Sequence, residues 1–230
     1  MNEINRIKEI YKKRDLSGKR KLYSYFNIAT LFTIHLREKE LIKILRKNSI
    51  NDLSDKKVLD LGCGSGGVLR DFIKYGARPE NLYGIDLLPD RIEEAKRLSP
   101  NINFTCGNAE NLPYEDNFFD MILCFTVFSS ILDRQMKQNI AREILRILKP
   151  EGIVLWYDYH MNNPKNPDVR GVKKKEIYEL FLGCQIYLKR ITLAPPLARA
   201  IAPYSWSACY LLEKIPFLKT HYLAVIKKKG

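Results

Sequence analysis

The sequence predicts a doubly wound α/β domain, and three observations carry that prediction. The stretch Val58 to Gly67 reads as a buried strand followed by a glycine-rich turn, and apolar residues at helical spacing follow directly. A second strand pattern ends in a carboxylate at Asp86. Further strand and helix patterns then alternate along the chain, which is typical of a parallel sheet with helices on both faces.

The glycine turn marks a ligand site at the end of the first strand. Its spacing is Gly62-x-Gly64-x-Gly66-Gly67, with Cys63 inside the turn. Glycine reaches positive φ and has no Cβ, so a ligand can approach the backbone closely. Because Gly62, Gly64 and Gly67 also satisfy the dinucleotide pattern G-x-G-x-x-G, the turn alone leaves a nicotinamide-binding oxidoreductase open.

Two carboxylates narrow the choice of ligand. Asp60 lies two residues before the first glycine, where it would repel a pyrophosphate but suit a ligand with an ammonium and a sulfonium group. Asp86 lies 22 residues past Gly64, at the end of the second strand, the place from which a carboxylate contacts ribose hydroxyls. The alternative for Asp86 is a helix cap, since Pro89 and Asp90 begin the next helix.

The stretch Val58 to Gly66 resembles the first motif of the class I S-adenosylmethionine-dependent methyltransferases, and the resemblance covers about residues 55–160. It is nearest to the quinone and small-molecule group of that class. It implies a Rossmann-like, seven-stranded sheet of order 3-2-1-4-5-7-6 with strand 7 antiparallel. It also implies an enzyme that uses S-adenosylmethionine and releases S-adenosylhomocysteine. The cofactor-binding residues would be Asp60, Gly62, Cys63, Gly64, Gly66, Asp86, Leu87, Asn108, Ala109 and Phe125. Asn108 stands where the family has an aspartate that contacts the adenine amino group.

The end of the fourth strand, Phe125 to Ser130, should face the acceptor. Quinone- and sterol-directed relatives often have histidines here, whereas this chain has Ser129-Ser130. The Asn/Asp-Pro-Pro-Tyr sequence of amine-directed base methylases is missing as well. In the family, the segment before the first strand often forms a lid, which makes Tyr23, Tyr25 and Phe26 candidates for the substrate wall; plain helix packing is the alternative.

A polar cluster follows the fifth strand, which we expect at Ile153 to Tyr157. Asp158 and His160 are the candidate general bases. Arg170 could clamp a carboxylate or phosphate. The alternative is an ordered loop held by its own turns. A metal site from this cluster is disfavoured, because it offers no helix-spaced ligand pair and no second carboxylate.

Residues 192–220 are a long connection between the sixth and seventh strands, and connections of this length tend to be functional. Arg199, Tyr204 and Trp206, together with Tyr210, are expected to cover the substrate. The same apolar stripe could instead form a dimer face or contact a membrane surface.

Size and composition predict one domain of 230 residues. Residues 1–50 would form an N-terminal helical lid, 51–160 the cofactor-binding core, and 161–230 the substrate-side elements. No apolar run approaches the roughly 18 residues of a membrane span. The five scattered cysteines favour free thiols in the cytoplasm.

The net charge of +13 lies outside the predicted core: residues 1–50 carry +8, residues 51–150 carry −2, and residues 151–230 carry +7. An acidic partner and simple solvated faces both explain it. We expect O-methylation of a small-molecule or glycan-like acceptor by a monomer or homodimer. RNA or protein methylation, a nicotinamide-dependent oxidoreductase and a non-catalytic binding protein are the alternatives.

Overall fold

The computed structural model describes residues 2–16, 22, 24–163 and 166–229. Tyr23, one of the predicted lid residues, lies outside the described residues. At the centre is a seven-stranded sheet of order β3-β2-β1-β4-β5-β7-β6. Its strands are β1 (Val58–Leu61), β2 (Leu82–Asp86), β3 (Asn103–Cys106), β4 (Phe119–Phe125), β5 (Leu148–Tyr159), β6 (Cys184–Leu193) and β7 (Lys219–Lys228). Strands β1 to β5 pair in parallel, whereas β7 is antiparallel to both β5 and β6. The predicted order is confirmed.

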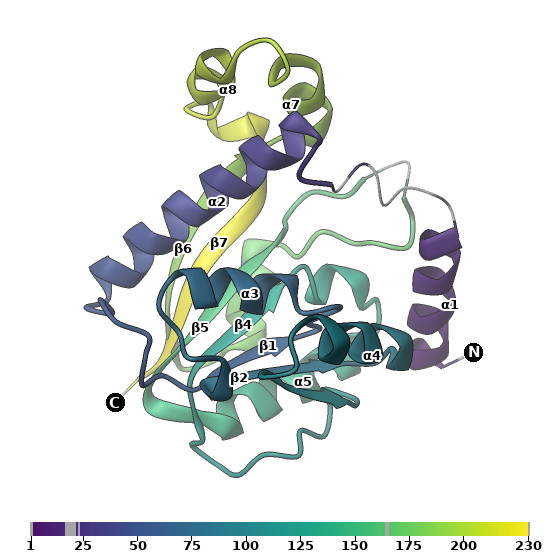
Figure 1. Ribbon diagram of the computed structural model, residues 1–230, viewed down its shortest axis with the longest axis vertical. Coiled ribbons are helices and arrows are strands. Elements are labelled where there is room, and N and C mark those ends of the chain that lie inside the picture. Colours follow the sequence, from purple (N-terminus) through teal and green to yellow (C-terminus); the bar gives the residue numbers. More distant parts are fainter. Residues whose placement is uncertain (1, 17–21, 23, 164–165, 230) are drawn as a thin grey trace.

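Helices cover both faces of this sheet (Figure 1). They are α1 (Glu3–Leu16), α2 (Ile28–Lys47), α3 (Gly67–Lys74), α4 (Pro89–Leu98), α5 (Arg134–Ile147), α6 (Lys174–Leu180), α7 (Pro195–Ile201) and α8 (Trp206–Leu212), with single 3₁₀ turns η2 (Pro79–Asn81), η3 (Phe128–Ser130) and η4 (Pro216–Leu218).

The alternation of side chains along the strands divides the core into two layers. On one face, Leu59 and Trp156 pack with apolar residues of α1, α5 and α6. On the other face, Val58 and Leu155 pack with apolar residues of α2, α3 and α4. The carboxyl ends of β1, β2, β3 and β4 therefore meet at one edge, with α1 on one side of it and α2 on the other.

The connection between β6 and β7 folds into a small helical cap of α7, α8 and η4 (Figure 1). It packs on α2 around Phe32, whose ring meets Trp206 at 5.5 Å and Tyr210 at 5.2 Å between centroids, both edge to face. Because Phe32 is fully buried, the cap and α2 form one apolar cluster.

One strand boundary differs from the prediction in a way that matters for the site. The fifth strand was expected to end at Tyr157, but β5 continues to Tyr159 and pairs with β7 from Ile153 to Tyr159. Asp158 therefore belongs to the strand, opposite Tyr222, and its side chain follows the alternation of Trp156 toward the α5 face.

Candidate active site

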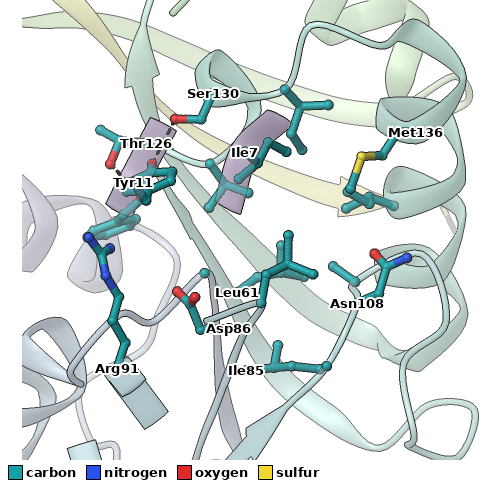
Figure 2. Close-up of a pocket in the computed structure, with 18 residues that line it drawn as sticks. Ile7, Tyr11, Leu61, Ile85, Asp86, Arg91, Asn108, Thr126, Ser130 and Met136 are labelled. Carbon is teal, nitrogen blue, oxygen red and sulfur yellow. Dashed lines mark hydrogen bonds between the residues drawn. The ribbon is translucent and has the colours of Figure 1, made fainter. Parts of the chain in front are cut away.

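A cavity of about 220 Å³ lies at the carboxyl edge of the sheet, between the ends of β1, β2 and β4 and beneath α1. Figure 2 shows Leu61, Asp86 and Ile85 on one side of it, Asn108 and Met136 at one end, and Ile7 and Tyr11 of α1 across it. The residues come from six separate segments of the chain. The fold, rather than any local sequence, therefore assembles this cavity.

The glycine turn is anchored to β2 by backbone hydrogen bonds. The amides of Gly62 and Cys63 donate to the carbonyl of Ile85 at 2.8 and 3.1 Å. Gly64 has φ +53°, and a Cβ built on it would meet only the Arg91 guanidinium, at 3.9 Å. Gly66 has φ +78°, and a Cβ there would lie 2.7 Å from the ring of Phe104. Packing against Phe104 explains why residue 66 is a glycine. The open space beside Gly64 instead suits a ligand that approaches the backbone.

The carboxylate of Asp86 is held in place by two amides. Its Oδ2 accepts from Gly64 N at 2.9 Å and its Oδ1 from Leu88 N at 3.0 Å. Because each carboxylate oxygen has a further lone pair, Asp86 can still accept two hydroxyl hydrogen bonds. It lines the cavity, as the prediction of a ribose contact requires.

Asp60 lies behind the turn rather than in the cavity wall. It is only 2% exposed, and burial, together with the nearby charge of Asp86, raises the pKa of its carboxyl to about 8. The Arg37 guanidinium acts in the opposite direction. A buried acid of this kind is stabilised as an anion only when a cation comes close.

Asn108 sits in a tight turn at the other end of the cavity. Its amide oxygen accepts from Glu110 N at 3.1 Å, and its amide nitrogen donates to a Glu110 carboxylate oxygen at 3.1 Å. The second oxygen of that carboxylate accepts from Asn139 at 2.7 Å. The turn fixes the side chain and leaves the amide oxygen one lone pair for a ligand.

The structure brings together most of the residues predicted for the cofactor. Gly62, Asp86, Leu87, Asn108, Ala109 and Phe125 line the cavity. The remaining four, Asp60, Cys63, Gly64 and Gly66, lie in or next to the turn that forms one wall.

Helix α1 closes the cavity from above. Ile7 and Tyr11 line it, and the hydroxyl of Tyr11 is hydrogen-bonded to the Ser130 hydroxyl at 2.9 Å (Figure 2). Arg6 donates to the Ser130 carbonyl at 2.7 Å, and Glu3 accepts from the amide of Leu132. Three contacts thus tie α1 to the segment after β4.

Sequence reasoning did not single out Ile7, Tyr11 or Arg91 as site residues. The Arg91 guanidinium lies 4.6 Å from the centre of the Tyr11 ring and places positive charge at the cavity. The predicted helical lid over residues 1–50 includes α1, but only the tertiary fold shows that these particular residues lie over this edge of the sheet.

Those residues predicted to bind substrate that the structure describes do not line this cavity. Tyr25 and Phe26 project into solvent, Phe26 being 98% exposed. Tyr204 is 89% exposed, whereas Trp206 packs against Phe32 in the cap. Ser129 is buried. The side chains of Arg170 and Arg199 are exposed, and the amide of Arg170 donates to the Ser129 carbonyl at 2.9 Å.

The candidate general bases also point away from the cavity. Asp158 accepts from the amide of Ser129 at 3.0 Å and from its neighbour Tyr159 at 2.8 Å, and burial raises the pKa of its carboxyl to about 6. His160 shares a hydrogen bond of 2.9 Å with the carbonyl of Lys219 and stacks on Tyr222. Burial lowers the pKa of the His160 imidazole. Both side chains therefore stabilise the backbone near the cavity and do not face into the cavity.

Among the residues that the structure describes, no three His, Cys, Asp or Glu side chains lie close enough together to hold a metal ion. Among the helices formed by these described residues, none has the length and apolar character needed to cross a membrane.

Comparison with known proteins decides between the ligand classes that the turn left open. Residues 58–152 match a family model described as a methyltransferase domain. The chain is 32% identical over 142 residues to norajmaline N-methyltransferase from Rauvolfia serpentina, which covers 56% of this chain and 47% of that protein. Residues 58–152 therefore form a methyltransferase domain, and the chain shares the fold of the class I S-adenosylmethionine-dependent methyltransferases. S-adenosylmethionine is the cofactor of that class.

Further similarities agree with a methyltransferase domain. The chain is 33% identical over 120 residues to phthiotriol/phenolphthiotriol dimycocerosates methyltransferase 1 from Mycobacterium ulcerans, covering 49% of this chain and 41% of that protein. The chain thus spans less than half the length of these curated relatives. A solved S-adenosylmethionine-dependent methyltransferase from Archaeoglobus fulgidus has the same fold, with a TM-score of 0.59, 18% identity, and coverage of 90% of this chain and all of that one.

The residues of this methyltransferase domain fit the cofactor. The open side of Gly64 leaves room for a ligand at the turn, and Asp60 offers a buried carboxyl beside it. Asp86 and Asn108 present acceptor oxygens along the cavity. Acceptors for ribose hydroxyls, for an adenine amino group and for an ammonium group therefore lie along one edge.

Proposed function

We propose that this protein transfers the methyl group of S-adenosylmethionine to a small-molecule acceptor. The observation that carries the proposal is the cavity beneath α1, which collects six of the ten residues predicted for the cofactor from the ends of four strands. The methyltransferase domain and its relatives support the reaction class.

When bound, the cofactor supplies an activated methyl group on a sulfonium. The protein then has to hold and orient the cofactor and the acceptor, and to exclude water from them. Asp86 would hold the ribose hydroxyls, Asn108 the adenine edge, and Asp60 the ammonium end. With α1 in place, Ile7 and Tyr11 cover the cavity and keep water from the reacting groups. Proximity and orientation of this kind can contribute several kcal/mol to the rate.

We propose an oxygen acceptor that carries an acidic group. The hydroxyls of Tyr11, Thr126 and Ser130 line the cavity and can hydrogen-bond a substrate hydroxyl, and Arg91 supplies positive charge nearby. Because Asp158 and His160 are turned to other partners, the acceptor proton would leave through these hydroxyls to solvent. An amine acceptor is the competing candidate, since one relative is named an N-methyltransferase.

We place the reaction in the cytoplasm. All five cysteines are unpaired in the structure, and free thiols persist in a reducing compartment.

The test follows a labelled methyl group. The protein is incubated with S-adenosylmethionine labelled in its methyl group and with cell extract separated into small molecules, RNA and protein. Label in the small-molecule fraction, lost when Gly64→Val replaces the wild type, is the expected result. Label confined to RNA or protein would contradict the small-molecule acceptor and favour the basic flanks as a binding surface. Chemical analysis of the labelled product then separates oxygen from nitrogen.

A further inference from the structure

On the α2 face of the sheet, Arg37 is a partly buried cation, with 18% of its side chain exposed, and it has an unused donor. Its Nε is buried and has no hydrogen-bond partner. Its nearest carboxylate, Asp71, lies 3.7 Å from Nη2 and makes a shorter contact, 2.9 Å, with Lys74. A buried guanidinium nitrogen without a partner is costly, so the site is incomplete unless a ligand supplies an acceptor.

The position of Arg37 links it to the cavity. Its guanidinium carbon lies 5.5 Å from the centre of the Phe125 ring and 5.6 Å from that of Tyr157. Phe125 lines the cavity at the end of β4. Two aromatic rings thus lie against the guanidinium and keep it next to the cavity wall, while α2 fixes the stem of the side chain.

The charge of Arg37 also reaches Asp60. It lowers the pKa of the Asp60 carboxyl and opposes the effect of burial there. A buried carboxyl and a partly buried guanidinium with one unpaired nitrogen therefore interact behind the glycine turn. The ligand chemistry that completes both at once is a zwitterion with an ammonium and a carboxylate on adjacent carbons, which is an α-amino acid.

We propose that Arg37 binds the carboxylate of the amino-acid end of the cofactor, with Asp60 beside it for the ammonium group. The inference rests on the proposed function and adds to it a residue outside the glycine motif. Arg37 acts by positioning: it fixes one end of the cofactor so that the other end reaches Asp86 and Asn108. Because Arg37 would bind the carboxylate and Asp60 the ammonium group, loss of Arg37 should weaken the binding only of ligands that have a carboxylate.

The test measures binding of three nucleosides by calorimetry to wild type and Arg37→Met. S-adenosylhomocysteine has both the ammonium and the carboxylate, the decarboxylated form of S-adenosylmethionine has only the ammonium, and 5′-methylthioadenosine has neither. Arg37→Met should weaken binding of S-adenosylhomocysteine by about 10- to 100-fold, as expected for a charge-assisted hydrogen bond. Binding of the other two ligands should stay within about twofold of wild type.

Arg46→Met is the matched control, because Arg46 lies on the same helix with an exposed side chain. It should bind all three ligands like wild type. An Arg37→Met protein that binds S-adenosylhomocysteine with wild-type affinity overturns the proposal. Equal weakening of all three ligands overturns it too, because that result indicates a structural role. Failure of the wild type to bind any of the three refutes the proposed function itself, and is thereby distinguished from failure of Arg37 alone.

Discussion

Asp60 can influence ligand binding although it does not line the cavity. Its side chain lies on the α2 side of the sheet, and burial raises the pKa of its carboxyl to about 8. Near neutral pH the empty site therefore holds a neutral acid. An approaching ammonium group favours the anion, so the proton should leave as the ligand enters.

The same shift makes a prediction about stability. Between its ordinary pKa near 3.8 and about 8, the folded protein holds a proton on Asp60 that the unfolded chain has lost. Stability from this group is therefore greatest at low pH and falls as pH rises to about 8. Asp60→Asn lacks this dependence. Its Tm, relative to wild type, should increase by about 10 °C between pH 5 and pH 8 in thermal denaturation.

A difference in Tm that stays constant between those two pH values would contradict the raised pKa. Asp55→Asn is the control, because Asp55 pairs with Lys56 at the surface, where an ion pair contributes little.

At the scale of elements, the predicted N-terminal lid over residues 1–50 includes α1, which covers the cavity. The aromatic residues Tyr25 and Phe26, the candidate substrate wall within that lid, project into solvent instead. Amphipathic spacing identifies a packed helix without saying which surface it packs on. The aromatic residues were conspicuous in composition, whereas Ile7 and Tyr11 have no local signal that separates them from ordinary core residues.

The predicted end of the fifth strand was wrong for another reason. Polar residues after an apolar run suggested a loop from Asp158 onward, but pairing with β7 extends the strand to Tyr159. Strand alternation then turns Asp158 toward Ser129. In contrast, the glycine turn, Asp86 and Asn108 were predictable, because their positions at the carboxyl ends of strands follow from the order of strands alone.

The cap of α7 and α8 gives a prediction about two aromatic residues that the sequence treated alike. Trp206 packs edge to face on Phe32, whereas Tyr204 projects into solvent. Trp206→Ala should therefore cost about 3 kcal/mol, or roughly 8 °C in Tm, because it leaves a cavity in the cluster with α2. Tyr204→Ala should leave Tm unchanged within about 1 °C.

Thermal denaturation of the two variants side by side provides the measurement. If Trp206→Ala keeps the wild-type Tm while it raises the KM for the acceptor, then Trp206 covers substrate as the sequence suggested, and its packing role is refuted.

Across the whole molecule, most of the net positive charge lies outside the part of the chain that forms most of the cavity. The region that carries the cavity is close to neutral, while the flanks before residue 51 and after residue 150 hold the positive charge. Helix α1 from the first flank roofs the cavity, α2 brings Arg37 to its edge, and the cap braces α2. The cavity thus opens from the region of low net charge, and helices of the first positively charged flank pack around it.

We expect the glycine turn after β1 to bind S-adenosylmethionine and its product. A calorimetric titration of S-adenosylhomocysteine into wild type and Gly64→Val tests this binding. We expect one site per chain in wild type. We expect no measurable binding in the variant, because a valine side chain occupies the open space beside the turn and strains a backbone with φ +53°. Wild-type affinity in Gly64→Val, or a wild type that binds NAD and ignores S-adenosylhomocysteine, would contradict this assignment.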